Sequence, residues 1–273
     1  MDKKMKKKLK RLRRKLIYLL PRNRFMYRVC RRYVYYYDGL FDIDMYANGE
    51  IRALKYVISS LKKPVVFDVG ANIGDWCQAA LQINPQAQIH CFEPGSYAFG
   101  KLTGRKFPPN VICNHFGFSS RPSIEKMTLY GNSKSMLNSL YDTPRYGREP
   151  VGYEEIKLET VTNYCKDRQI ERVDFMKIDV EGHEYEALVG ASEMLQQNRV
   201  HAIQFEYGET YIHAGRWLKD IFEYVAKFNY CIYRILHHQL LPIQEYSTDL
   251  ENYAYANFLL LLRDQSVGEK LKV

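Results

Sequence analysis

The chain has 273 residues, enough for one large hydrophobic core, and its six cysteines form no CxxC pair, which argues against a disulfide framework or a zinc site. The net charge of +9 is uneven: residues 1–32 hold 15 Lys or Arg and one acid, whereas the remainder holds 25 Lys or Arg and 30 Asp or Glu. This mildly acidic body excludes a protein that binds nucleic acid over its whole folded surface.

The first predicted element is a basic amphipathic helix over residues 3–20. Its apolar residues recur at helical spacing before Pro21 ends the pattern, namely Met5, Leu9, Leu12, Leu16 and Leu19. Such a helix suits an anionic membrane surface; a solvated basic tail and a helix that docks on a partner protein are the alternatives. No stretch is long and apolar enough to span a membrane, and no signal-peptide pattern is present. We therefore expect a cytoplasmic protein, peripheral at the inner face of the membrane if this helix binds lipid.

Two further segments precede the main motif. Residues 25–37 are rich in Tyr and Arg and are predicted to be a connector that packs on the domain and contributes to an acceptor site, and residues 49–61 are predicted to be a helix. We therefore expect an N-terminal extension and connector over residues 1–47. A folded domain would follow over residues 48–265, and a short tail over residues 266–273.

The central motif is a strand, a glycine turn, a helix and a second strand. Residues 65–69 are an apolar run that includes Asp68, and Gly70 and Gly74 follow at once. Glycine lets a ligand approach the main chain, and backbone N–H groups at a helix start form the floor of a pocket. The next strand ends on Glu93, where an acid can accept hydrogen bonds from both ribose hydroxyls. The motif predicts a site for a nucleoside-bearing cofactor; a tight turn without a ligand is the alternative.

Strands and helices then alternate to the end of the domain. The predicted strands are 111–116, 124–130, 173–180, 200–205, 230–236 and 255–262, and the predicted helices are 94–106, 161–169, 181–197 and 216–228. Residues 131–154 form a long polar and aromatic segment, which we interpret as a lid or an acceptor-binding segment; a disordered insertion is the alternative.

This alternation predicts an α/β fold with a doubly wound, Rossmann-like, mostly parallel sheet. Ligands of such sheets bind beyond the carboxyl ends of the strands. Four acids lie at or beside predicted strand ends, namely Asp68, Glu93, Asp179 and Glu206. We expect them to converge on one edge of the sheet.

Five motifs together resemble the FkbM family of S-adenosylmethionine-dependent O-methyltransferases. They are Phe67-Asp-Val-Gly-Ala-Asn-Ile-Gly, Phe92-Glu-Pro, Asn114-His-Phe-Gly-Phe-Ser, Met176-Lys-Ile-Asp-Val-Glu-Gly-His-Glu and Gln204-Phe-Glu-Tyr-Gly. The resemblance covers roughly residues 48–262, and it implies a class I methyltransferase fold with seven strands, the last antiparallel. It implies S-adenosylmethionine as the cofactor and a hydroxyl as the acceptor, often on a sugar of a glycan or a glycosylated metabolite. The basic N-terminal segment lies outside the shared domain, so its two candidate partners through residues 1–20, an anionic membrane surface and a glycosyltransferase, are not implied by the resemblance.

The resemblance also suggests a role for each residue of the cofactor site. Backbone groups of Gly70, Ala71 and Asn72, in the loop that Gly74 closes, would hold the methionine part, and Asn72 belongs to the family's form of this loop. Asp68 would orient the loop, Glu93 would bind the ribose and Phe118 would flank the adenine. Asp179 would lie nearest the methyl group and the acceptor.

A sugar hydroxyl is a weak nucleophile at neutral pH, so a base or a metal ion must assist. Glu181 and His183 are the candidate bases, because both follow the strand that ends on Asp179. Asp179 and Glu206 are candidate ligands of Mg²⁺ or another divalent ion, since hard oxygen ligands suit it. The alternative is that Glu206 pairs with Lys177 or Arg234.

Two other classes of function compete with methyl transfer. A nicotinamide-dependent oxidoreductase would use the glycine turn and Glu93, but it gives the Lys177–Gly182 stretch no role. A non-catalytic, membrane-associated binding module would use the basic helix, but it leaves the converging acids unexplained, because they would repel one another without a ligand. Cofactor binding separates the three classes.

Overall fold

The computed structural model describes residues 3–19, 22–40, 42–130, 138–141 and 149–263. The chain forms two compact units, Met1–Asp38 and Gly39–Val273, and each is described by itself.

The first unit contains two helices, α1 (Lys3–Leu19) and α2 (Arg24–Asp38), and no residue of either helix is buried. The Asn23 side chain caps α2, because its Oδ1 accepts hydrogen bonds from the backbone N–H groups of Phe25 (2.9 Å) and Met26 (3.1 Å). The amphipathic pattern therefore predicted the first helix, whereas residues 25–37 were expected to be a connector and are helical. Among the described residues, no helix is long and apolar enough to cross a membrane.

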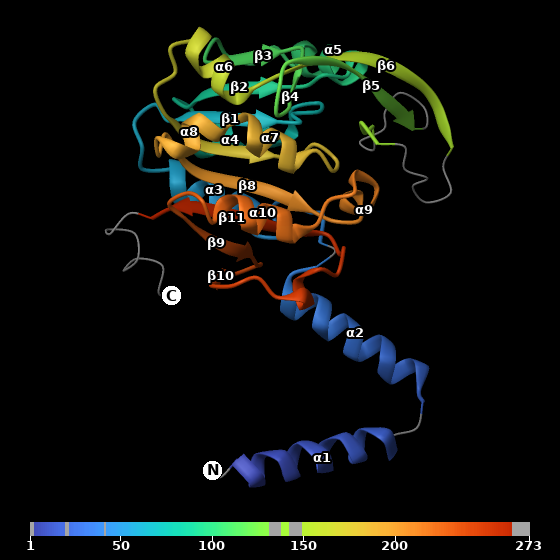
Figure 1. Cartoon of the computed structure of the whole chain (residues 1–273). Helices are drawn as coiled ribbons and strands as arrows, with labels where there is room; N and C mark the ends of the chain where they lie inside the picture. Colours follow the sequence, from blue (N-terminus) through green and yellow to red (C-terminus); the bar gives the residue numbers. More distant parts are fainter. Residues whose placement is uncertain (1–2, 20–21, 41, 131–137, 142–148, 264–273) are drawn as a thin grey trace. The chain divides into compact units, whose positions relative to one another are not determined.

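The second unit is built on an eight-stranded mixed sheet (Figure 1). In spatial order its strands are β10 (Leu240–Ile243), β9 (Tyr230–Ile235), β11 (Ala256–Leu262), β8 (Val200–Tyr207), β7 (Val173–Ile178), β1 (Val65–Val69), β2 (Gln88–Phe92) and β3 (Val111–Asn114). Neighbours from β8 to β3 pair in parallel, and β11 is antiparallel to both of its neighbours. The predicted α/β fold with an antiparallel last strand is confirmed. The sheet also has an edge strand, β10, that was not predicted from the sequence.

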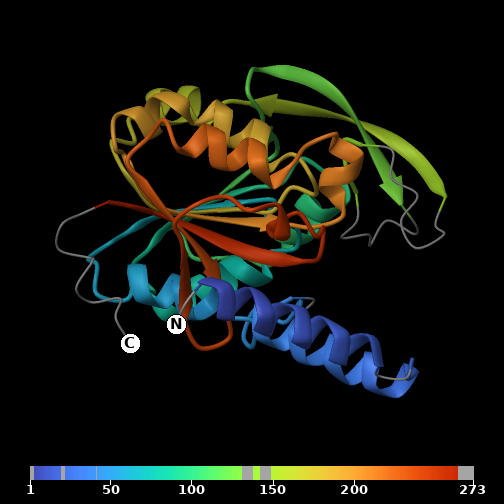
Figure 2. The same cartoon turned by 60° about the horizontal axis from the view of Figure 1, so that its bottom comes forward.

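Helices cover both faces of this sheet. On one face, α3 (Glu50–Ile58), α4 (Asp75–Ile83) and α5 (Ser96–Gly104) contribute side chains to a core with Val66, Ile89 and Phe175. The remaining helices are α6 (Val161–Asp167), α7 (Glu184–Gly190), α8 (Ser192–Gln196), α9 (Thr210–Ala214) and α10 (Leu218–Val225), with a 3₁₀ turn η1 (Thr248–Leu250). Figure 2 shows the light-blue and teal helices on one side of the sheet and the yellow and orange helices on the other.

The predicted helix over residues 181–197 is two helices that begin later than expected. Glu181 and Gly182 have φ values of 57° and 102°, so α7 begins only at Glu184. A Cβ on Gly190 would lie 2.1 Å from the carbonyl oxygen of Ser119, which shows how closely the chain here approaches its neighbour. Helix α7 ends at Gly190, the residue that makes this contact. Ala191 is not helical, and α8 begins at Ser192.

A second sheet of three strands lies beside the first. It contains β4 (Gly117–Phe118), β5 (Ser123–Tyr130) and β6 (Pro150–Glu159), in the order β4-β6-β5. The prediction of a loop over residues 131–154 is therefore partly wrong, since residues 150–154 pair with β5. Ser139 forms a bridge with Thr128 of β5, and residues 131–137 and 142–148 lie outside the described residues.

The approach at Gly190 predicts a measurable cost for a side chain there. Gly190→Ala should lower the free energy of unfolding by about 1–3 kcal/mol, because the added methyl group overlaps the Ser119 carbonyl. Gly100→Ala in α5 is the matched control: nothing lies within 4 Å of its Cβ, so the change should raise stability by roughly 0.5–1 kcal/mol. Urea unfolding of both variants tests this, and equal effects at the two positions would contradict the packing described.

Candidate active site

Polar side chains form two rows at the carboxyl edge of the main sheet. Asp68, Lys177 and Gln204 are partners in the register of β1, β7 and β8. Asp179 and Glu206 lie two residues later on the same strands. Because alternate residues of a strand point to the same face, both rows face the side that α3 and α4 cover. The convergence of Asp68, Asp179 and Glu206 results from this register.

The backbone of the glycine turn contacts the ends of both neighbouring strands, β2 and β7. Gly70 has a φ of 83°, and a Cβ there would lie 1.8 Å from the carbonyl oxygen of Asp179. The N–H groups of Gly70 and Ala71 donate to the Phe92 carbonyl at 2.9 and 3.0 Å. These N–H groups were expected to hold a ligand, but they are already bonded within the protein. The missing side chain of Gly70 therefore admits the Asp179 backbone, and that of Gly74 admits the Leu102 side chain, 2.7 Å from the position of its Cβ.

Glu93 is fixed at the tip of β2 by two backbone amides. Its Oε2 accepts from the Asn72 N–H at 2.8 Å and its Oε1 accepts from the Gly95 N–H at 2.8 Å. Burial raises the pKa of this carboxyl to about 7, although the two amides oppose the shift. Each carboxylate oxygen keeps a further lone pair for a hydroxyl donor. Glu93 therefore joins the loop at Asn72 to a position where ribose hydroxyls would bind.

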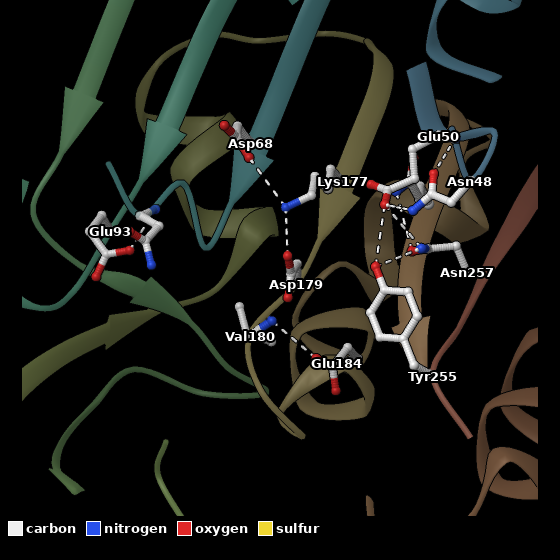
Figure 3. Close-up of polar contacts among 12 residues, drawn as sticks. Asn48, Glu50, Asp68, Glu93, Lys177, Asp179, Val180, Glu184, Tyr255 and Asn257 are labelled. Carbon is white, nitrogen blue, oxygen red and sulfur yellow. Dashed lines mark hydrogen bonds and ion pairs between the residues drawn. The ribbon is translucent and has the colours of Figure 1, made fainter. Parts of the chain in front are cut away.

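A buried ammonium group lies between Asp68 and Asp179. The Nζ of Lys177 is 2.8 Å from Asp179 Oδ2 and 3.9 Å from Asp68 Oδ1 (Figure 3). Burial disfavours the charged lysine, but the carboxylates of Asp179, Asp68 and Glu50 together raise its pKa. Asp68 is fully buried, and within the described residues neither of its oxygens has a hydrogen-bond partner. Burial raises the pKa of Asp68 to about 6, and Lys177 opposes the shift.

Glu206 lies among other acids. Burial, followed by the nearby Asp179, Glu181 and Glu184 carboxylates, raises its pKa well above the usual range. Two cations were suggested as alternative partners of Glu206. Of these, Lys177 pairs with Asp68 and Asp179, and the Arg234 guanidinium lies 5.3 Å from the ring centre of Phe258. Within the described ranges, no three or more His, Cys, Asp or Glu residues are grouped to hold a metal ion. The divalent ion expected at Asp179 and Glu206 stays a prediction.

The two candidate bases lie in different surroundings. Glu181 stands in the tight turn after Asp179, where its carbonyl oxygen accepts from Ser139 Oγ at 2.9 Å. His183 contacts Tyr141 Oη through Nδ1 and Ser119 Oγ through Nε2, both at 2.9 Å, and burial lowers its pKa to about 4. Its ring lines a cavity of about 290 Å³ with residues of β5 and α7. His183 is therefore neutral, and both of its ring nitrogens are engaged.

Phe118 is 1% exposed and packs in an aromatic cluster with Phe67, Phe92 and Tyr164. Its ring centre is 4.3 Å from that of Phe92. In this structure the Phe118 ring lies in the core, and the adenine contact suggested for it stays a prediction.

A buried polar network beside these rows was not predicted from the sequence. Glu50, at the start of α3 and 4% exposed, accepts from Asn48 Nδ2 and Gln204 Nε2, both at 2.6 Å. Asn257 Nδ2 donates to it at 3.1 Å, and Tyr255 Oη lies 3.4 Å away (Figure 3). The signal in the sequence was the pair Gln204 and Asn257, which are polar residues beside apolar residues in two strands.

Comparison with known proteins identifies a family of methyltransferases. A family model described as the methyltransferase FkbM domain matches residues 68–235. The 2-O-methyltransferase NoeI of Sinorhizobium fredii is 28% identical over 204 residues, which cover 66% of this chain and 82% of that protein. The hexuronic acid methyltransferase AglP of Haloferax volcanii is 28% identical over 179 residues, which cover 63% of this chain and 66% of that protein. A crystal structure of a methyltransferase FkbM from Methylobacillus flagellatus aligns with a TM-score of 0.47 and 14% identity, over 73% of this chain and 44% of that one.

The position of Lys177 predicts a strong dependence of stability on its charge. Lys177→Met should lower the free energy of unfolding by about 3–5 kcal/mol near pH 8, because it leaves Asp68 buried without a counter-charge. The loss should shrink as the pH falls from 8 towards about 6, because Lys177 lowers the pKa of Asp68 and its removal lets the carboxyl take up a proton at higher pH, and adding Asp68→Asn should restore much of the loss. Lys166→Met is the control, since the Lys166–Glu193 pair is exposed to solvent and its loss should change stability little. Urea unfolding in which the two lysine variants behave alike would refute this account.

Proposed function

Because this chain belongs to the FkbM family of S-adenosylmethionine-dependent methyltransferases, we propose that it methylates a hydroxyl group of a sugar. Family membership favours methyl transfer over the two other classes of function that the sequence left open, the nicotinamide-dependent oxidoreductase and the non-catalytic binding module. The observation that carries the cofactor assignment is Glu93, which the Asn72 amide joins to the glycine turn. A nucleoside-bearing ligand would meet both features at the same edge of the sheet.

The names of the relatives support an oxygen acceptor and a sugar. One is a 2-O-methyltransferase, one a hexuronic acid methyltransferase, and one a 31-O-demethyl-FK506 methyltransferase from Streptomyces tacrolimicus, 28% identical over 155 residues. The alignments cover 82%, 66% and 60% of these three proteins. Two of the names specify an oxygen position and one specifies a sugar acid, which supports as the acceptor class a hydroxyl on a sugar of a glycan, a cell-surface polysaccharide or a glycosylated metabolite.

The residues of the site fit this cofactor. Glu93 would accept hydrogen bonds from the ribose hydroxyls with the oxygen lone pairs that its two amides leave. Asp68 is buried with no hydrogen-bond partner among the described residues and lies directly before the glycine turn, where it would balance a positive charge. The N–H groups of Gly70 and Ala71 are bonded to the Phe92 carbonyl, so other groups of the loop would hold the methionine part. The cofactor supplies the methyl group as an electrophile.

The chain must also hold the acceptor oxygen in line and take its proton. Asp179 would orient the acceptor, because its carboxylate is 32% exposed and Lys177 fixes it from one side. Glu181 would take the proton, since it lies two residues after Asp179 in a turn whose backbone is held by the hydrogen bond from Ser139 Oγ to the Glu181 carbonyl oxygen. His183 would support the turn through Tyr141 and Ser119 rather than act as the base.

Cofactor affinity should depend on Glu93 and on pH. Calorimetric titration with S-adenosylhomocysteine should show affinity rising from about pH 6 to about pH 8, because ionisation of Glu93, whose pKa is about 7, creates the acceptor for the ribose. Glu93→Gln should weaken binding at least about 30-fold at the upper pH and flatten the profile. Exposed Glu171 is the control, and Glu171→Gln should bind like the wild type.

Binding of NAD⁺ in place of S-adenosylhomocysteine would overturn the cofactor assignment. An unchanged affinity of Glu93→Gln would place the ribose elsewhere.

The two candidate bases predict different losses of turnover. Glu181→Gln should lower kcat for methyl transfer to a sugar acceptor by about 100-fold, the usual scale of base catalysis, with cofactor affinity unchanged. His183→Gln should lower kcat less than about tenfold, because Nδ1 and Nε2 already bond to Tyr141 and Ser119. Near-normal turnover of both variants would refute the assignment of the base. Loss of turnover in EDTA, restored by Mg²⁺, would add the predicted divalent ion to the mechanism, and full activity in EDTA would remove it.

A further inference from the structure

Helix α1 carries an exposed apolar stripe. Its members repeat at intervals of three and four residues, and they are exposed by between 39% and 78%, namely Met5, Leu9, Leu12, Leu16 and Leu19. This spacing places them on one face of the helix. A continuous exposed stripe of this kind marks a surface that binds something apolar.

The rest of α1 is almost entirely cationic. Lys3–Leu19 contains ten Lys or Arg and no acid. These long side chains flank the stripe, where their methylene stems can lie along an apolar surface while the charges reach a polar layer. An apolar stripe with only basic flanks matches the two layers of an anionic membrane surface.

Helix α2 repeats the arrangement with aromatic residues. Its exposed stripe consists of Phe25, Met26, Val29, Tyr33 and Tyr37, exposed by between 46% and 72%. On another side of the helix, the Arg31 guanidinium lies 5.6 and 5.4 Å from the ring centres of Tyr27 and Tyr35. Tyrosine is enriched at the boundary between lipid and water, because its ring is apolar and its hydroxyl is polar.

The charge of the chain is divided between its two units. Residues 1–38 contain 15 Lys or Arg and two acids, whereas residues 39–273 contain 25 Lys or Arg and 29 acids. No residue of α1 or α2 is buried. The attraction to an anionic surface therefore resides in the first unit alone.

We propose that α1 and α2 together bind the surface of an anionic lipid bilayer and hold the methyltransferase domain there. Nucleic acid would require the cations but not the two apolar stripes. A lipid surface requires both, and each basic residue near an anionic leaflet strengthens binding roughly fivefold. The methylated acceptor would then be one that is presented at a membrane, although the lipid binding itself does not depend on the acceptor.

The test is co-sedimentation of the full chain with phosphatidylcholine vesicles, with and without phosphatidylglycerol. Wild type should bind only the anionic vesicles. The triple variant Leu9→Gln, Leu12→Gln, Leu16→Gln keeps charge and helix propensity but removes the stripe, and it should lower the partition coefficient at least about 100-fold. The quadruple variant Lys6→Gln, Lys10→Gln, Arg13→Gln, Arg14→Gln should do the same through charge.

The matched control removes four exposed lysines of the domain, by Lys55→Gln, Lys62→Gln, Lys101→Gln and Lys227→Gln. It should bind vesicles like the wild type. Affinity for S-adenosylhomocysteine should be the same in all variants, which separates this proposal from the proposed function. The proposal is overturned if the stripe variant binds as well as the wild type or if the control loses as much. Binding to an RNA oligonucleotide without binding to vesicles would overturn it in favour of nucleic acid.

Discussion

The ammonium group of Lys177 is buried between two carboxylates, and the carboxyl edge of the sheet is organised around it. Its Nζ contacts Asp179 on its own strand and lies within ion-pair distance of Asp68 on β1. A buried charge is tolerated only when its partners are close, so these three side chains fix one another. The tips of β1 and β7 are thereby held in register at the point where a ligand would bind.

The main chain reinforces this arrangement. The Asp179 carbonyl occupies the space that a side chain on Gly70 would need, and the Asn72 amide donates to Glu93. The glycine turn therefore connects the tips of β7 and β2 through its own backbone. Gly70 is required for the close approach of the two strand ends, so a ligand would bind to a loop whose conformation the protein already fixes.

The sequence predicted this edge because parallel strands buried on both faces read as apolar runs, and polar residues mark where they end. Asp68 and Glu93 were found in that way. Glu50 was not, because a glutamate at a helix start reads as an exposed cap, and its burial comes from Gln204 and Asn257, which are distant in the chain. Strand β6 (Pro150–Glu159) was not predicted, because its first half contains Pro150 and Gly152 and is exposed or only half-buried, so it lacks the sequence signals of a buried strand.

If the cofactor binds at this edge, the charge around Lys177 would also influence the release of the spent cofactor after methyl transfer. One buried cation stands against the carboxyl groups of Asp68, Asp179 and Glu50. A sulfonium donor carries a positive charge at sulfur, and the thioether that remains after transfer does not. Carboxylates in a poorly solvated site attract the first more than the second. Each turnover would therefore reduce the attraction of the edge for the molecule that it holds, so that exchange of spent for fresh cofactor is favoured by electrostatics alone.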